Sequence, residues 1–163
     1  MLSNAEGTAL TASTTGSPEM KTVPTETFPT PSRTRLSSQF GDPNSGLRSI
    51  TELSGSAVVI HVGGDIDASN ESVWQRMVSR TASIAVAPGP FVIDVRALDF
   101  MGSCAYAALA NEAVRCRRRG VNLRLVGNQP VVARTIAACG LGQLLPMYTS
   151  VENALSPPLN DLG

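Results

Sequence analysis

The composition of this 163-residue chain lacks the usual signs of a membrane protein or a polyanion binder. Basic and acidic residues number 13 each, so no net charge attracts nucleic acid or an anionic membrane surface. Aromatic residues make up 4%, which leaves few rings for stacking on bases. No apolar run approaches the roughly 20 residues of a membrane span. The first residues also lack the basic start and apolar stretch of a secretory signal. These absences predict a cytoplasmic protein with no direct nucleic-acid or membrane partner.

Cysteine and histidine are also scarce. The three cysteines include no Cys-x-x-Cys pair, which argues against a disulfide framework or a zinc site. The single histidine, His61, lies inside a predicted strand, and there is no Gly-x-Ser-x-Gly turn to present a nucleophile. Phosphate-binding glycine loops of the nucleotide-binding type are absent as well. We therefore expect a protein that is not an enzyme and that uses no metal, cofactor or small-molecule substrate.

The chain divides into three parts by composition. Residues 1–47 are dominated by Ser, Thr, Pro and Gly, which bury too little apolar surface to offset the entropy of ordering, and we predict a disordered arm. Residues 48–156 carry the apolar periodicity of one folded domain. Residues 157–163 begin with two prolines and are expected to form a short loose end.

Within the domain, apolar strands alternate with amphipathic helices. Strands are predicted over residues 57–62, 91–95, 122–126 and 145–148. The first helix follows Asp67, Ser69 and Asn70, all capable caps, and the second covers residues 103–119 and ends at Gly120. A third helix lies between Asn128 and Gly140, and a fourth is short. This alternation predicts an α/β fold with a mostly parallel sheet.

The most informative segment is the junction of the second strand and second helix. Gly102 and Ser103 stand where the helix of small residues begins. Backbone N–H groups there are unpaired and the helix dipole is positive, so a phosphate on Ser103 would be tolerated by its own helix. This is the chemistry of a switch. A serine that only caps the helix is the alternative interpretation.

This segment resembles the signature of the anti-sigma factor antagonists built on the STAS domain. In that family an Asp ends a strand, an apolar run follows, and a phosphorylatable serine opens a helix. The matching positions are Asp94, Leu98, Phe100, Met101 and Ser103. A second signature, Gly-Glu-Leu-Asp after a strand, is matched by Gly64, Ile66 and Asp67, with Asp65 in place of Glu. Two positions depart from the pattern: Gly102 replaces an Asp, and Cys104-Ala105 replace Ser-Gly.

The resemblance implies a STAS-type mixed sheet flanked by helices, and a protein that binds an anti-sigma factor, possibly a serine kinase, to free a sigma factor for transcription. Phosphorylation of Ser103 would block that binding. Beside Ser103, the residues expected at the partner surface are Asp65, Asp67, Ser69, Asn70, Asp94, Met101, Gly102 and Cys104.

Other interpretations stay open. The chain could be a STAS scaffold or regulatory subunit in a larger signalling or lipid-transport complex, with Ser103 unmodified. It could also be a redox-gated antagonist, because Cys104 adjoins the switch serine and Cys139 ends the next helix. A metal site at Asp65 and Asp67 lacks further ligands. The basic run at residues 115–119 is typical of a solvated helix end favoured by the dipole.

Overall fold

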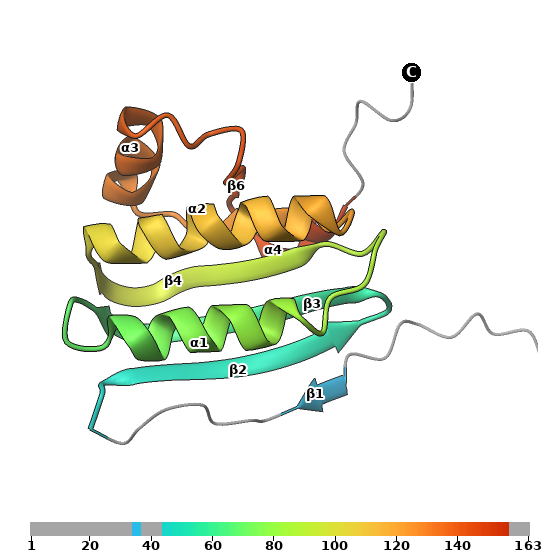
Figure 1. Ribbon diagram of the computed structural model, residues 1–163, viewed down its shortest axis with the longest axis horizontal. Coiled ribbons are helices and arrows are strands. Elements are labelled where there is room, and N and C mark those ends of the chain that lie inside the picture. Colours follow the sequence, from blue (N-terminus) through green and yellow to red (C-terminus); the bar gives the residue numbers. More distant parts are fainter. Residues whose placement is uncertain (1–33, 37–43, 157–163) are drawn as a thin grey trace, which may run out of the picture. The chain divides into compact units, whose positions relative to one another are not determined.

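In the part of the chain that the structure describes, six strands form one mixed sheet, and each strand lies beside its neighbours in the chain (Figure 1). The computed structural model describes residues 34–36 and 44–156. The first, second and third strands pair antiparallel, and from the third strand to the sixth all neighbours pair parallel. In chain order the strands are β1 (Thr34–Leu36), β2 (Leu47–Ser54), β3 (Ala57–Ile66), β4 (Phe91–Met101), β5 (Leu123–Val126) and β6 (Met147–Tyr148). The mixed sheet flanked by helices that the resemblance implied is confirmed.

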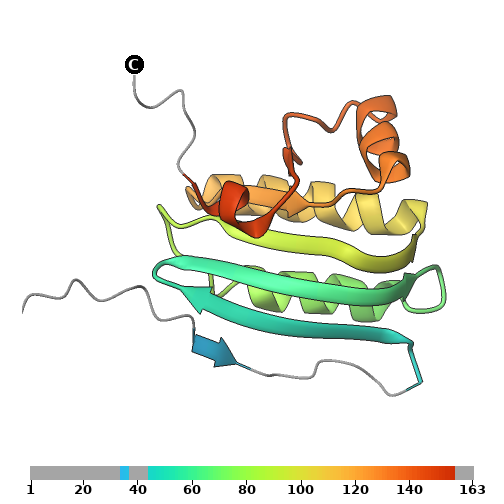
Figure 2. The same cartoon turned by 180° about the vertical axis from the view of Figure 1, so that it is seen from behind.

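Helices cover the two faces of the sheet unequally. The helices are α1 (Glu71–Ala82), α2 (Ser103–Arg118), α3 (Pro130–Ala138) and α4 (Val151–Leu155). Figures 1 and 2 show α1 and α2 side by side on one face, and the short α4 on the other. The main core lies under α1 and α2, where Trp74 and Leu109 pack on Ile60 and Ile93. The apolar residues recur at the spacing of one strand face and one helix face. Burying these faces against each other places the two helices on the sheet.

Strands β3 and β4 extend further than the apolar pattern predicts. The predicted strands at 57–62 and 91–95 ended before Gly63 and Arg96, but β3 runs to Ile66 and β4 to Met101. Parallel pairing continues through two register shifts, so that Ile66 stands beside Met101. The polar residues Asp65 and Asp99 are exposed there. Polar side chains at alternate, exposed positions interrupt the apolar pattern although the backbone continues to pair. The strand ends were therefore predicted too early.

Strand β2 and the short β1 lie in a region that gave no strand signal. Part of β2, and all of β1, fall within residues 1–47, for which disorder was predicted; at Thr34–Leu36 and at Leu47 that prediction was wrong. β2 carries polar residues on its inward face, and β3 supplies its hydrogen-bonding partner. Residues 44–46 also belong to the fold, since the Ser45 carbonyl accepts a hydrogen bond from the Asn70 side chain. The remaining residues of the predicted arm, 1–33 and 37–43, and the predicted tail at 157–163 lie outside the described residues.

Glycine is required at position 64, close to the end of β3. Gly64 has φ +108°, and a Cβ at that position would collide with the carbonyl oxygen of Gly46. The loop before β2 can therefore lie directly on β3, near the start of the β3–α1 turn. Helix ends agree more closely with expectation, since α2 begins at Ser103 and the Ser150 hydroxyl accepts a hydrogen bond from the N–H of Asn153 at 3.1 Å, capping α4. For α3 the cap position is Gln129, not Asn128.

Candidate functional site

The candidate site lies at the edge of the sheet where β3 and β4 end and where α1 and α2 begin. Ile66 and Met101, the last residues of the two strands, are partners in the parallel ladder. Beyond them, the N–H of Gly102 donates to the carbonyl of Ile66 at 2.8 Å. This bond ties the start of α2 to the β3–α1 turn. The sequence-predicted residues from 65–70 and 101–104 are therefore brought together at one edge.

Ser103 is exposed as the first residue of α2. Gly102 occupies the cap position with extended backbone, and no side chain caps the helix. The first turn holds no acidic residue, so the positive end of the helix dipole is not neutralised by its own helix. A hydroxyl in this place is accessible to a partner, and an anion added to it faces unpaired N–H groups.

The β3–α1 turn beside Ser103 is held by its own side chains. The Asp67 carboxylate accepts from the N–H of Ser69 at 2.8 Å and from its hydroxyl at 2.5 Å. These hydrogen bonds lower the pKa of Asp67 below its ordinary value, so this exposed group is charged at neutral pH. Asp65, Asp67 and Ser69 are all exposed and form a polar rim next to the helix start.

Asn70 has a different position from the one expected. Its side chain is 4% exposed and is used entirely inside the fold. The amide oxygen accepts from the N–H of Asp67 at 3.0 Å, and the amide nitrogen donates to the carbonyls of Asp65 at 2.8 Å and Ser45 at 3.0 Å. A buried amide with all these partners cannot be presented to another protein. Asn70 shapes the turn and attaches the loop before β2 to it.

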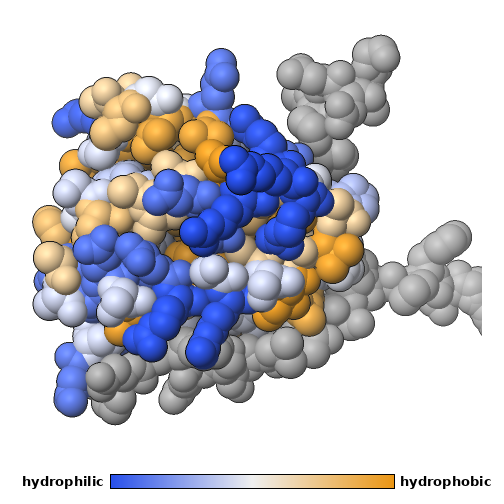
Figure 3. All heavy atoms as spheres, in the orientation of Figure 1, coloured by the Kyte–Doolittle hydropathy of each residue, from blue (hydrophilic) through white to orange (hydrophobic). Residues whose placement is uncertain are grey.

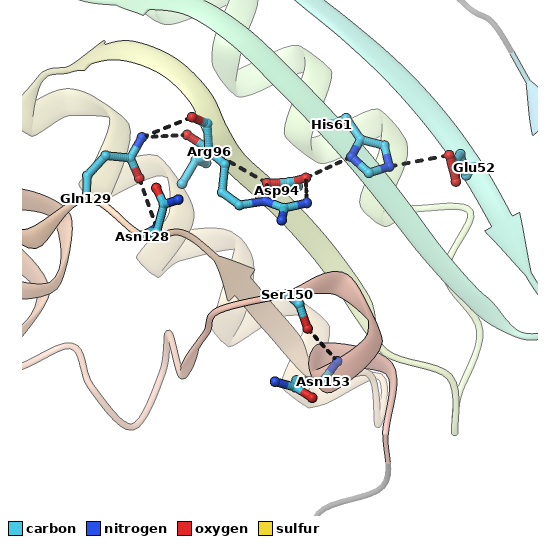
Figure 4. Close-up of polar contacts among 9 residues, drawn as sticks. Glu52, His61, Asp94, Arg96, Asn128, Gln129, Ser150 and Asn153 are labelled. Atoms are coloured by element: carbon cyan, nitrogen blue, oxygen red, sulfur yellow. Dashed lines mark hydrogen bonds and ion pairs between the residues drawn. The ribbon is translucent and has the colours of Figure 1, made fainter.

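Asp94 also departs from expectation. It was placed at a strand end near Ser103, but β4 continues well beyond it, to Met101. Its side chain points to the sheet face opposite α1 and α2, because Val92 on the same face packs on α4. Figure 4 shows Asp94 between His61 and Arg96 in the middle of the sheet. Asp94 is therefore not part of the Ser103 edge.

The contacts of Asp94 form an ionic chain across three strands. Its carboxylate lies 2.9 Å from Nδ1 of His61 and accepts two bonds from the Arg96 guanidinium, at 2.9 and 2.8 Å. On the far side, Nε2 of His61 lies 3.4 Å from Glu52. Burial alone would raise the pKa of Asp94, but the bonds from His61 and Arg96 outweigh it and hold that pKa well below its usual range. The bond to Asp94 raises the pKa of His61 despite the opposing effect of burial.

An apolar hollow adjoins the Ser103 edge where β4 passes α3. It measures about 110 Å³, and Val95, Leu98, Met101, Tyr106 and Val132 help to line it. At its rim Phe100 is 56% exposed and Val131 is 62% exposed, which is unusual for such large apolar side chains. Sequence reasoning missed Val131, because only the packing of α3 beside β4 brings it near Phe100.

Gln129 fixes that packing. Its amide nitrogen donates to the carbonyl of Val95 at 3.0 Å and to that of Leu98 at 3.2 Å. The ladder between β4 and β5 ends at Asp94, so these carbonyls have no strand partner from β5. One side chain replaces the missing strand and joins the start of α3 to β4. A Gln just before a proline carried no signal of this role in the sequence.

Comparison with known proteins identifies the family of this chain. A family model of the STAS domain matches residues 49–154. This chain belongs to the STAS domain family. A protein of Mycobacterium tuberculosis named "Putative anti-anti-sigma factor Rv2638" is 53% identical over 127 residues, covering 78% of this chain and 86% of that protein. The anti-sigma-F factor antagonist RsfA of the same species is 50% identical over 113 residues, covering 69% of this chain and 88% of RsfA. The resemblance drawn from the sequence is confirmed.

The STAS fold is also seen directly in a solved structure. The crystal structure of an anti-sigma factor antagonist from Mycobacterium paratuberculosis superposes with a TM-score of 0.60 at 24% identity, and the match covers 70% of this chain and 94% of that one.

Gly102 is a local departure from the STAS pattern that the structure helps to explain. A Cβ at this position would lie 3.1 Å from the carbonyl oxygen of Ile66 and 3.7 Å from Cα of Asp67. The backbone at Gly102 has φ −72°, which any residue can adopt, so no turn geometry demands glycine here. The absence of a side chain at Gly102 allows α2 to start close to the β3–α1 turn. It also means that no Asp carboxylate lies beside Ser103 at this position.

The cysteines of this STAS domain differ in environment, and all three are free thiols. Cys104 is partly exposed in the first turn of α2, and Cys139 is exposed at the end of α3. Tyr106, on the same helix as Cys104, is buried in one core cluster with Val132 and Ile136 of α3, so the two helices pack together. Cys116 is buried, and burial raises the pKa of its thiol, which makes it unreactive.

Residues 34–36 and 44–156 include no cluster of three or more His, Cys, Asp or Glu side chains placed to hold a metal ion. In the same part of the chain, no helix is both long and apolar enough to cross a membrane.

Proposed function

We propose that this chain is an anti-sigma factor antagonist that binds an anti-sigma factor, frees a sigma factor for transcription and is switched by phosphorylation of Ser103. The observation that carries the proposal is the exposed Ser103 hydroxyl at the start of α2, next to the rim formed by Asp65, Asp67 and Ser69. The names of the two relatives, at 53% and 50% identity, support the class of partner. Such a protein would act in the cytoplasm, where transcription takes place.

The contact surface would combine this rim with the apolar residues beside it. Phe100 and Met101 come from the end of β4, Gly102 and Cys104 flank the serine, and Val131 completes the hollow. Exposed apolar side chains of this size supply the buried centre of an interface, and the surrounding polar groups supply its rim. A phosphate on Ser103 would add about −1.5 to −2 charges at the centre of that contact. Beside Asp65 and Asp67 this charge has no cationic partner from the rim itself, so docking would be lost.

Binding, not catalysis, is the activity that we propose. Ser103 would need a base to act as a nucleophile. His61 points to the opposite face of the sheet, where Glu52 and Asp94 engage both ring nitrogens. The serine would therefore serve as a phosphate acceptor, and the kinase activity with its ATP would belong to the partner.

The test is binding of the purified chain to candidate anti-sigma factors of the host. Ser103→Ala should bind as the wild type does, whereas Ser103→Glu should bind roughly 30-fold more weakly or worse, because it buries an unpaired charge in the interface. Ser83→Glu is the matched control: it adds the same charge at an exposed position after α1, at the far end of that helix. Incubation with the partner and ATP should place one phosphate on the wild type and none on Ser103→Ala.

Two results would count against this proposal. If Ser103→Glu binds as tightly as the wild type, Ser103 is not in the interface. If no anti-sigma factor binds, a scaffold role in a larger complex becomes the better explanation.

A redox-gated form of the same function is favoured by one observation. Cys104 adjoins Ser103 and is partly exposed, while the second accessible thiol, Cys139, directly follows α3, which packs against α2. Oxidation of Cys104 would alter the surface next to the proposed interface. Partner binding should then fall after mild oxidation, and Cys104→Ala should abolish that response. An unchanged affinity after complete oxidation would exclude redox gating.

A further inference from the structure

Arginine side chains gather at one end of the two-helix layer. Arg80 lies in the last turn of α1, and Arg115, Arg117 and Arg118 lie in the last turn of α2, followed at once by Arg119. The two helices run side by side in the same direction, so these residues share one end of the domain, which we call the arginine end. In Figure 3 strongly hydrophilic side chains cover the C-terminal part of α2.

Two of these arginines donate hydrogen bonds to backbone carbonyls, which do not neutralise their charge. Arg117 donates to the carbonyl of Gln143 at 3.0 Å, and Arg119 donates to the carbonyls of Ala82 at 2.9 Å and Ala85 at 3.2 Å. A carbonyl satisfies a hydrogen bond without cancelling a charge. Arg115 is paired with Glu112 at 3.4 Å, and Arg118 is exposed. Contacts with the fold therefore order the arginine end but leave it strongly positive.

Acidic side chains outnumber basic ones at the opposite end of the same layer. Asp65, Asp67 and Asp99 are exposed there and Glu71 opens α1, whereas α3 contributes Arg134 and β2 contributes Arg48 beside Gly63. We call this the acidic end; it contains Ser103. Because α2 has 16 residues, the two ends are separated by about 24 Å along that helix. The full chain is nonetheless neutral at pH 7, so the charges are segregated within a molecule that has no net charge.

Each end also exposes large apolar side chains beside its charges. At the acidic end these are Phe100 and Val131, 56% and 62% exposed. The segment after α1, beside the arginine end, exposes Ile84 at 47% and Val86 at 64%. Apolar centres surrounded by charges of opposite sign are complementary to each other. Zero net charge removes the repulsion that otherwise keeps copies of a protein apart.

From these observations we propose that the arginine end binds the acidic end of a second copy of this chain. The contact is heterologous, so one copy can bind the next in a head-to-tail chain. It covers Ser103 and therefore competes with any partner that binds at the same edge. This consequence rests on the proposed function, but the self-association does not. A phosphate on Ser103 would add negative charge to the acidic end and strengthen the contact.

The experiment measures the weight-average mass of the purified full-length chain by sedimentation, at low and high ionic strength. The wild type should associate reversibly at low salt and dissociate at high salt, because salt screens the exposed charges on which the contact depends. Reversing the arginine end (Arg80→Glu with Arg118→Glu) should weaken association about tenfold or more. Reversing the acidic end (Asp65→Lys with Asp99→Lys) should have the same effect.

Mixing gives the decisive result. Each double substitution removes most of the net charge of one end and leaves the other end intact: three arginines remain beside two introduced glutamates, or two acidic residues beside two introduced lysines. In an equimolar mixture the intact arginine end of one variant can bind the intact acidic end of the other, so association between unlike variants should return. Arg76→Glu is the control, because it changes the same kind of charge at an exposed position in the middle of α1, between the two ends. Thermal melts confirm that all variants are folded. Ser103→Glu should associate more tightly than the wild type.

Three outcomes would overturn the proposal: a wild type that is monomeric at low salt, association that the reversals do not weaken, or a mixture that does not associate. Association that persists in both reversed variants would place the contact on another face. Since no other protein is present in the experiment, none of these outcomes bears on binding to an anti-sigma factor.

Discussion

Replacing Asp94 with asparagine tests the ionic chain that joins β2, β3 and β4. The substitution keeps the shape of the side chain but removes its charge. Asp94 is 8% exposed, and its carboxylate receives hydrogen bonds from His61 and from the Arg96 guanidinium. The asparagine side chain would present one oxygen in place of two, and its amide nitrogen would face the donors of Arg96. The unfolding free energy should therefore fall.

The size of the effect follows from burial. Removing one partner from a fully buried ion pair costs about 3–5 kcal/mol. Here the His61 and Arg96 side chains remain 32% and 38% exposed, so water can solvate them after the carboxylate is lost. We expect Asp94→Asn to lower the unfolding free energy by about 2–4 kcal/mol, against about 5–15 kcal/mol for a typical domain. Asp99→Asn, at an exposed position of the same strand, should change it by less than about 0.5 kcal/mol.

The difference should depend on pH in a defined way. The pKa of His61 is raised in the folded state, so its contribution is complete below the unfolded value of about 6.5 and is lost as pH rises through the folded pKa. The pKa of Asp94 is lowered, so its contribution is present above an unfolded value of about 4 and is lost as pH falls through the folded pKa. The deficit of Asp94→Asn should be largest between about pH 4 and 6.5 and smaller above that range.

Urea unfolding of the wild type, Asp94→Asn, His61→Gln and the double variant between about pH 5 and 9 measures these differences. The reasoning is refuted if Asp94→Asn costs less than about 0.5 kcal/mol, or if its cost does not shrink above the folded pKa of His61. Binding at the Ser103 edge should be unchanged by Asp94→Asn, because the side chain lies on the other face of the sheet.

Three further substitutions test the supports of the site. Gly64→Ala should lower the unfolding free energy by more than about 3 kcal/mol or prevent folding, because the new Cβ would collide with the backbone of Gly46. Gly55→Ala is the control: it also lies at positive φ but in open space, and it should cost about 1 kcal/mol in the same urea assay. Gln129→Leu should cost about 1–3 kcal/mol and speed hydrogen exchange at the start of α3, since the carbonyls of β4 lose their donor. Arg124→Met should cost about 2–4 kcal/mol, because Arg124 is only 7% exposed and its guanidinium donates to the carbonyl of Ala154 in α4. An unchanged melting temperature would contradict this role.

Most of the site could be predicted from local sequence. The run of small residues after Gly102 marks a helix start, and the helix does begin at Ser103. The polar cluster after Gly64 marks a strand end and turn, and its exposed members lie beside that helix start. These features depend on residues that are close in the chain, and helix starts and turns are determined at that range.

The two misplaced residues show where local reasoning failed. Asn70 looked like an exposed cap, but two of its three hydrogen bonds go to Ser45 and Asp65, and the first of these belongs to a loop 25 positions away. Asp94 looked like a strand end, because Asp94 and Arg96 interrupt the apolar run at that point. One of its partners is on the neighbouring strand β3, so only the register of the sheet could reveal the ionic chain.

The sequence by itself determined the α/β class, the order of most elements and the position of Ser103 at a helix start, because periodicity, caps and glycine stops act over a few residues. It also determined the family. Tertiary structure alone decided which side chains meet across the sheet: the contact of Asp94 with His61, the placement of Val131 beside Phe100, the bonds of Gln129 to β4, and the separation of arginines from carboxylates at opposite ends of the helices. Each of these depends on strand register and helix packing, which bring together residues far apart in the chain and leave no periodic signal in it.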